Sequence, residues 1–262
     1  MVLHTRPGWG IDKTSRKSGA SGRRPQNTPD LRDAISVLHQ ITAWFLLSKF
    51  KGEMPLVRCR WGETRMKKVK IDLLRPTQVT HGLREILDKT KTYESLTGHD
   101  LDMAIAEKPV PVVLGPDGAP FAIDHHHVAS ALWRAGIKSV PFVLVCDLSS
   151  LTRADFWLTM ENNRWAYPYD AQGRRVAFAD LRDHVWELID DDFRSLSAAV
   201  RDAGGYEKTT VPLEEFRWSD FLRRHLPPPE SDAEYDALVK KGVKLAKTKV
   251  ALGLPGYLGP AD

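Results

Sequence analysis

The sequence has few cysteines, no long hydrophobic run and little net charge outside its first 30 residues. Its 262 residues include two cysteines, Cys59 and Cys146, and no CxxC pair. No disulfide framework can be read from them. We therefore expect a chain that folds around a hydrophobic core, for which an apolar content of 42% is sufficient.

The longest uncharged apolar run covers residues 34–48, which contain no Asp, Glu, Lys or Arg. A helix that crosses a membrane needs about 20 such residues. Residues 1–30 are polar and rich in Gly, Ser and Arg, unlike a signal peptide. We therefore predict a helix over 31–50 that packs on the main domain, no membrane partner and a cytoplasmic location.

The positive charge is confined to the start of the chain. Residues 1–30 carry six Lys or Arg and two Asp, which accounts for the whole net charge of +4. The rest of the chain is neutral, so a basic nucleic-acid groove in the main domain is not expected. We interpret residues 1–30 as a disordered basic arm, and contact of this arm with DNA or RNA is the alternative.

Periodicity after residue 66 predicts an α/β or α+β layout. Alternating apolar residues predict a strand over 67–74, and the turn Gly115-Pro116-Asp117-Gly118 predicts a β-hairpin over 110–123. A strand is also expected over 140–146. The predicted helices are residues 83–96, 100–107, 125–135 (which ends at Gly136), 152–163, 179–190, 191–203 and 213–226.

These elements suggest five parts of the chain. We expect Pro227-Pro228-Pro229 to end the folded part, and a charged helix over 231–250 to follow it. The predicted parts are the arm (1–30), an N-terminal helix and linker (31–65), an α+β domain (66–150), a helical subdomain packed on it (151–226) and a charged C-terminal helix or tail (227–262).

The run Asp124-His125-His126-His127 lies where the hairpin gives way to a helix. Asp124 is a suitable N-cap, and the first-turn N–H groups of such a helix attract anions, phosphate above all. Neighbours on a helix lie about 100° apart, so the three histidines cannot all face one pocket. One of them could transfer a proton or bind a phosphoryl oxygen, or Asp124 and histidines could hold a metal.

A second group follows the first predicted strand. Arg75-Pro76-Thr77-Gln78 should break that strand, and His81 and Glu85 come soon after. Arg75 could hold a phosphate and Glu85 could act as a base, although Arg75 could equally be a surface charge beside a turn. The acidic run 190–192 could bind a divalent cation, but we interpret it as the end of one helix and the cap of the next. We interpret the aromatic residues of 214–223 as core.

These motifs resemble the ParB/sulfiredoxin superfamily. KVKIDLLRPTQ and PVPVVLGPDGAPFAIDHHHVASALWRAGIKSVPFVLV are most similar to its ParB-like nuclease branch, as are YPYDAQG, DDFRSL and EFRWSDFLR. The resemblance covers residues 66–226. It implies an α+β fold with a small mixed sheet and helices, followed by a mainly helical C-terminal region.

In this superfamily the junction after the hairpin contacts the phosphates of ATP, ADP or CTP. The resemblance thus implies a nucleotide, with a divalent cation such as Mg²⁺, as candidate cofactors. Asp124 matches the family's Asp, but His125 stands where Gly is usual and Val128 where a phosphate-binding Arg is common. These departures disfavour tight triphosphate binding. Without a helix-turn-helix segment after residue 150, centromere binding is also disfavoured.

We therefore predict an enzyme that performs phosphoryl transfer, either phosphodiester hydrolysis or small-molecule phosphorylation, on a phosphate-bearing small molecule or nucleic acid. The alternatives are a non-enzymatic DNA- or nucleotide-binding module and a metal-dependent hydrolase. The sequence specifies neither metal ligands nor an oligomeric state. The predicted catalytic residues are Asp124, His126, His127 and Glu85, and the predicted substrate- or phosphate-binding residues are Arg75, Gln78, His125 and His81.

Overall fold

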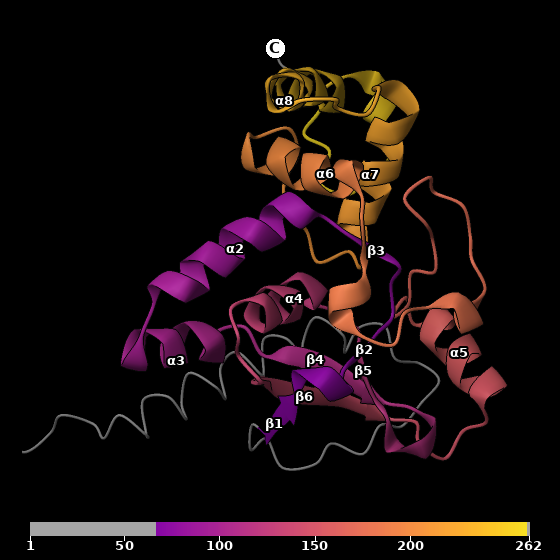
Figure 1. Ribbon diagram of the computed structural model, residues 1–262. Coiled ribbons are helices and arrows are strands. Elements are labelled where there is room, and N and C mark those ends of the chain that lie inside the picture. The colour runs from indigo at the N-terminus through magenta and orange to yellow at the C-terminus, as the bar shows by residue number, and fades with distance from the viewer. Residues whose placement is uncertain (1–66, 261–262) are drawn as a thin grey trace, which may run out of the picture.

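The computed structural model describes residues 67–260 (Figure 1), so the predictions for the arm, the N-terminal helix and the linker lie outside the described residues. Strand β1 (Lys67–Lys70) is followed by a 3₁₀ turn, η1 (Ile71–Leu73), where the sequence predicted a continuous strand. The turn brings Ile71 and Leu74 into the core while Leu73 remains exposed. Strand alternation would have placed Ile71 and Leu74 on opposite faces.

One mixed sheet of five strands forms the base of the molecule, in the order β1-β6-β4-β5-β2. The predicted hairpin is confirmed, because β4 (Val110–Leu114) and β5 (Pro120–Ala122) pair antiparallel. The predicted strand over 140–146 is also confirmed as β6 (Ser139–Asp147). The first strand ends before Arg75, as predicted, although already at Lys70, and Arg75 and Pro76 form a separate short strand, β2 (Arg75–Pro76), parallel to β5. An edge strand tolerates proline.

Helices cover both faces of this sheet. On one face, α2 (Leu83–Ser95), α3 (Gly98–Ala106) and α4 (His126–Arg134) enclose a core around Ile86, Val112 and Leu132. On the other face, α5 (Arg153–Asn162) packs Phe156 and Met160 against the sheet. All four helices were predicted, and α4 ends before Gly136, whose φ of 79° suits glycine.

A stack of helices lies on the far side of α2 and α4 from the sheet (Figure 1). It consists of α6 (Asp192–Asp202), α7 (Glu214–His225) and α8 (Asp232–Ala246). The expectation that the folded part ends at Pro227–Pro229 is wrong. Helix α8 buries Leu238 in this helical core, and the Trp218 indole N–H donates to the Pro255 carbonyl (2.8 Å).

The predicted helix over 179–190 is also wrong. This segment contains two 3₁₀ turns, η3 (Phe178–Asp180) and η4 (Val185–Glu187), and the short strand β7 (Ile189–Asp190), which pairs with β3 (Thr80–His81). Tertiary contacts override the helical spacing of its apolar residues. The Ser130 hydroxyl donates to the Val185 carbonyl (2.6 Å), and Trp186 stacks on Trp133.

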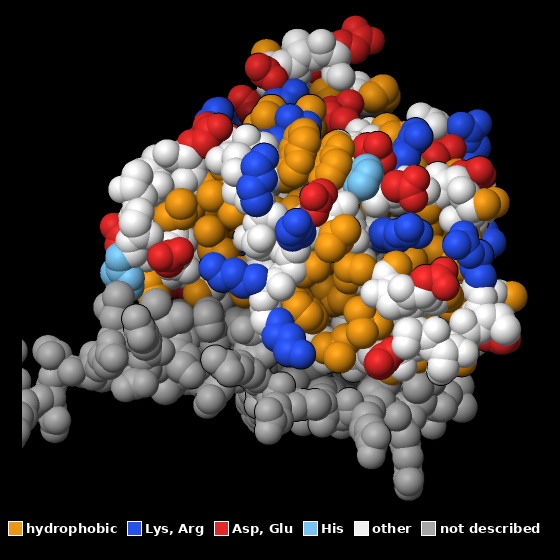
Figure 2. Space-filling model, turned by 60° about the horizontal axis from the view of Figure 1, so that its bottom comes forward, with side chains coloured by type: hydrophobic (Ala, Val, Ile, Leu, Met, Phe, Trp, Pro, Cys, Tyr) orange, Lys and Arg blue, Asp and Glu red, His pale blue; other side chains and the backbone are white. Residues whose placement is uncertain are grey.

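No helix among residues 67–260 is long and apolar enough to cross a membrane. With the lower side of the molecule turned forward, the described surface shows a group of apolar side chains among Lys, Arg, Asp and Glu side chains (Figure 2). The described chain is thus a mixed α+β fold with a helical C-terminal region. The fold places the start of α4 against the layer formed by α6 and α7.

Candidate functional site

The turn from β5 into α4 is built on a left-handed residue. His125 has φ 58° and ψ 25° and is itself the N-cap, so the prediction that Asp124 caps the helix is wrong by one position. The Asp124 carboxylate instead accepts the His125 backbone N–H (2.7 Å). The His125 ring donates from Nδ1 to the Pro109 carbonyl (2.8 Å), which fixes a conformation that favours glycine.

His126 points into the protein and connects the two sequence motifs. Its side chain is buried, and its Nε2 accepts the backbone N–H of Thr77 (3.1 Å). Burial lowers the pKa of His126 to about 3, although Asp124 acts in the opposite direction. The ring is therefore neutral near pH 7, and its Nε2 is occupied by the hydrogen bond from the Thr77 N–H.

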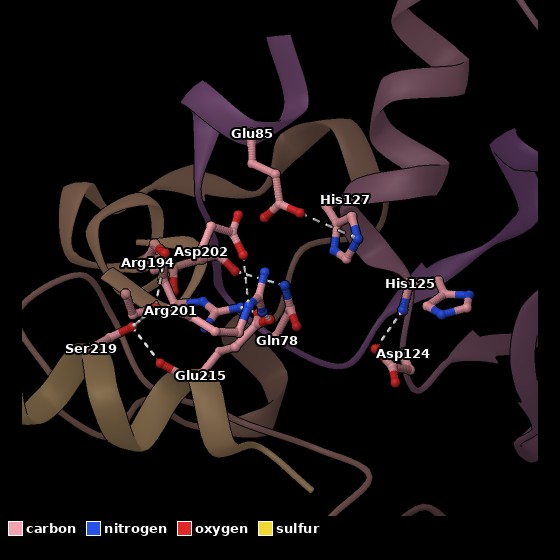
Figure 3. A network of polar contacts seen from close by, with 12 residues as sticks. Gln78, Glu85, Asp124, His125, His127, Arg194, Arg201, Asp202, Glu215 and Ser219 are labelled. Atoms are coloured by element: carbon pink, nitrogen blue, oxygen red, sulfur yellow. Dashed lines mark hydrogen bonds and ion pairs between the residues drawn. The ribbon is translucent and has the colours of Figure 1, made fainter. Parts of the chain in front are cut away.

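His127 is the histidine that meets a carboxylate across the site. Its Nε2 lies 3.7 Å from Oε1 of Glu85, a residue of α2. The same oxygen lies 3.4 Å from the Lys89 ammonium group, one turn further along α2. Both the His127 and Glu85 side chains are partly exposed, so water and a ligand can reach the pair (Figure 3).

These residues line a cavity of about 270 Å³ between α2, the start of α4, and helices α6 and α7. The first-turn residues of α4, His126, His127 and Val128, line it, and the N–H groups of a first turn have no helical acceptor of their own. Its lining carries six Lys or Arg residues against four carboxylates, before any histidine is protonated. The six basic residues are Lys89, Lys108, Arg164, Arg194, Arg201 and Lys208.

The arginines of α6 were not among the site residues predicted from the sequence. Arg194 and Arg201 lie two turns apart, on one face of that helix, and both pair with Glu215 of α7. Burial alone would raise the pKa of Glu215, but the two guanidinium groups outweigh it and lower the pKa to about 2. The seven-residue spacing was a readable signal, but the carboxylate that gives it meaning lies on another helix.

The other predicted substrate-binding residues, Gln78, His81 and Arg75, lie in three different places. Gln78 lines the cavity at the start of α4 and is anchored by its amide to the Thr80 carbonyl (2.8 Å). His81 is buried in β3, and burial lowers its pKa to about 4 despite the opposing charge of Asp190. Arg75 lines a different, smaller cavity beside Phe121 and Trp157. The structure therefore does not bring Arg75 to the start of α4.

Two predictions from the sequence are confirmed near the cavity: the acidic run 190–192 caps a helix, and Trp218 belongs to the core. Asp190 accepts the Leu83 N–H at the start of α2 (2.8 Å), and Asp191 caps α6 by accepting the Phe193 N–H (3.0 Å). Trp218 is core, as expected. Phe216 is also largely buried, but it lines the cavity as well and packs under the Arg194 guanidinium group, 3.8 Å from its ring centroid.

Among residues 67–260, no group of three or more His, Cys, Asp or Glu side chains is arranged to hold a metal ion. A cation that arrives with a phosphate needs less, since Mg²⁺ in phosphoryl-transfer sites takes one or two carboxylates beside phosphate oxygens. Asp124 and Glu85 line the same cavity. The described residues therefore fit a metal bound together with a phosphate better than a closed metal site.

Comparison with known proteins identifies the family. The family model described as "Putative ParB-like nuclease" matches residues 67–224. The solved structure of protein Atu1540 from Agrobacterium tumefaciens is 38% identical, with a TM-score of 0.68, and the match covers 75% of this chain and 100% of that one. No curated protein matches. The matched region holds the β5–α4 turn, Glu85 and the arginines of α6, and this chain belongs to the ParB-like nuclease family.

Proposed function

We propose that this protein is a phosphodiesterase that binds the scissile phosphate at the start of α4 and activates water with His127. The observation that carries the proposal is the Glu85–His127 pair, whose nearest atoms are 3.7 Å apart at the mouth of a cavity rich in basic residues. A histidine beside a carboxylate is a common general base. The family description supports hydrolysis rather than phosphorylation of a small molecule.

The reaction needs a proton acceptor and a place for the phosphate. The first-turn N–H groups of α4 and the positive end of its dipole favour a phosphate there. Glu85 orients the His127 ring, whose nitrogen takes a proton from water. The water oxygen forms the new bond to phosphorus, and the bond to the leaving oxygen breaks. The leaving oxygen takes a proton from solvent, to which His127 releases its own.

The turn Asp124–His127, called the DHHH turn below, also contributes residues other than His127 to this phosphate site. His125 and Asp124 hold the left-handed turn from which α4 begins, and both line the cavity. His126 fastens the turn to Thr77. A divalent cation, bound by phosphate oxygens and a carboxylate such as Asp124, would neutralise charge on the phosphate.

The test is hydrolysis of bis-p-nitrophenyl phosphate by the full chain, with Mg²⁺ or with a chelator. We expect His127→Gln and Glu85→Gln to lower kcat by about 100-fold or more, the range for loss of a general base. His99→Gln, a substitution of an exposed histidine on α3, is the matched control and should retain activity. Equal turnover by wild type and His127→Gln contradicts the proposal, and nucleotide binding without turnover supports a binding module instead.

A further inference from the structure

Arg194 is a largely buried cation with unused hydrogen-bond donors. Its side chain is 10% exposed, and the guanidinium group lies over the ring of Phe216. One nitrogen, Nη2, donates to Glu215 (3.3 Å). The other two, Nε and Nη1, have no hydrogen-bond partner among residues 67–260. Buried donors of a charged group are costly to leave unpaired.

The charges around Arg194 do not balance. Arg201 has a side chain that is 16% exposed, and it shares the single carboxylate of Glu215 with Arg194. Its other partner, Asp202, is mostly exposed to solvent, so its charge is screened. Two guanidinium groups therefore face one carboxylate in a poorly solvated place, which leaves one positive charge for an anion to neutralise.

The position of this group relative to the DHHH turn is visible in Figure 3. Arg194, Arg201 and Glu215 gather on one side, and Asp124 and His125 lie on the other. All five residues line the same cavity. A molecule bound at the start of α4 can thus extend toward the arginines of α6.

We propose that Arg194 and Arg201, held in place by Glu215, form a second phosphate subsite in this cavity. This inference rests on the proposed function, and it specifies the substrate as a phosphodiester that carries a second, terminal phosphate. A short oligonucleotide with a phosphorylated end has this chemistry. Arginine suits this task because its planar group donates several hydrogen bonds to phosphate oxygens.

The experiment compares dinucleotides that share one scissile diester. TpT has no terminal phosphate, whereas pTpT and TpTp carry one on the 5′ or the 3′ side. For the wild-type full chain we expect kcat/KM to be about 10-fold or more higher for one of the phosphorylated dinucleotides than for TpT. In Arg194→Gln this ratio should fall to about one. Arg175→Gln, a substitution of a surface arginine paired with Glu161, should keep the wild-type ratio.

Arg194→Lys provides a second variant if Arg194→Gln does not fold. It keeps the charge but loses the planar set of donors, so we expect the ratio to fall at least about threefold. A wild-type ratio near one for both phosphorylated dinucleotides overturns the second subsite and leaves the proposed hydrolysis intact. An unchanged ratio in a folded Arg194 variant also overturns it.

Equilibrium binding separates this inference from the proposed function. His127→Gln should keep the dinucleotides uncut, so Kd for TpT, pTpT and TpTp can be measured on it by calorimetry. We expect one phosphorylated dinucleotide to bind about 10-fold or more tightly than TpT, and Arg194→Gln in this background to remove the difference. If no dinucleotide is cleaved by wild type, the hydrolysis proposal fails, and these Kd ratios alone decide the subsite.

Discussion

Thr77 and His126 are joined by a hydrogen bond from the Thr77 backbone N–H to Nε2 of the His126 ring (3.1 Å). This bond connects the LRPTQ segment to the DHHH turn across 49 residues of sequence. The Thr77 hydroxyl adds a second link by donating to the Ala122 carbonyl at the end of β5 (2.8 Å). The two motifs therefore form one structural unit, in which His126 accepts a hydrogen bond from Thr77 and His127 faces the cavity.

Stability should depend on pH through this buried ring. The pKa of His126 is about 3 in the folded protein, below its ordinary value of 6.5. Between these values the unfolded chain binds a proton that the folded chain does not, so stability falls as pH decreases below about 6.5. The expected slope is about 1.4 kcal/mol per pH unit from this residue. Above pH 6.5 the residue contributes no slope.

Urea unfolding at pH 7.0, 6.0 and 5.0 measures this dependence. We expect His126→Asn to be less stable than wild type at pH 7.0, by about 1–3 kcal/mol, because the Thr77 N–H loses its acceptor. The variant should also have the shallower pH slope. His81, whose pKa is lowered to about 4, contributes in the same direction and remains in both proteins. Equal slopes in the two proteins would mean that His126 is accessible to protons in the folded state.

His125 gives a test of backbone strain at the DHHH turn. Its φ of 58° favours glycine, and the ring compensates by donating to Pro109. His125→Ala keeps the strain and loses the hydrogen bond, so it should destabilise the fold by about 1–2 kcal/mol. His125→Gly should be more stable than His125→Ala by about 1 kcal/mol. Urea unfolding of both variants measures the difference, and a more stable alanine variant would contradict the left-handed turn.

Local signals predicted much of the fold. Apolar spacing, turn residues and the glycine stop located α2, α4 and the hairpin correctly, because each signal acts within a few residues. The helix predicted over residues 179–190 is wrong. Leu181, Val185 and Leu188 have helical spacing, but contacts with Ser130 and Trp133 hold this segment in 3₁₀ turns and a short strand. Long-range pairing of this kind is not visible in a single sequence.

The candidate site was predicted in the same uneven way. The DHHH turn, Gln78 and Glu85 were predicted because they follow recognisable junctions, and all of them line the cavity. Arg194 and Arg201 were missed because their importance depends on Glu215, Phe216 and the packing of α6 against α7. Arg75 was assigned to the site from its nearness in sequence to Gln78. Two residues, Pro76 and Thr77, lie between them, and Arg75 of β2 lines another cavity.

The placement of Arg75 leads to a test of its predicted role in substrate binding. Arg75 lines the smaller cavity beside Phe121, whereas Gln78 lines the cavity at the start of α4. We expect Arg75→Ala to retain kcat/KM for a phosphodiester within about twofold, and its stability within about 0.5 kcal/mol, because the side chain is exposed. Gln78→Ala should raise KM. A large loss of activity in Arg75→Ala alone would show that the smaller cavity takes part in the reaction.

Helix α8 should contribute to the stability of the layer that carries Arg194 and Arg201. Leu238 is 4% exposed and belongs to the core formed with Leu196, Val200 and Leu222. Leu238→Ala removes buried methyl groups and leaves a cavity, so it should lower the free energy of unfolding by about 2–4 kcal/mol. Leu252→Ala is the matched control, because that leucine is 75% exposed and its loss should cost less than about 0.5 kcal/mol.

Urea unfolding, followed by the fluorescence of tryptophan, measures both variants, since Trp218 lies in the same core. If the charged C-terminal helix were only a tail, as the proline run suggested, the two leucine variants would be equally stable. The predicted gap between them requires α8 to be part of the folded unit. Because α6 packs against α8, loosening this core should also weaken binding at the arginines of α6, and Leu238→Ala should raise KM more than Leu252→Ala does.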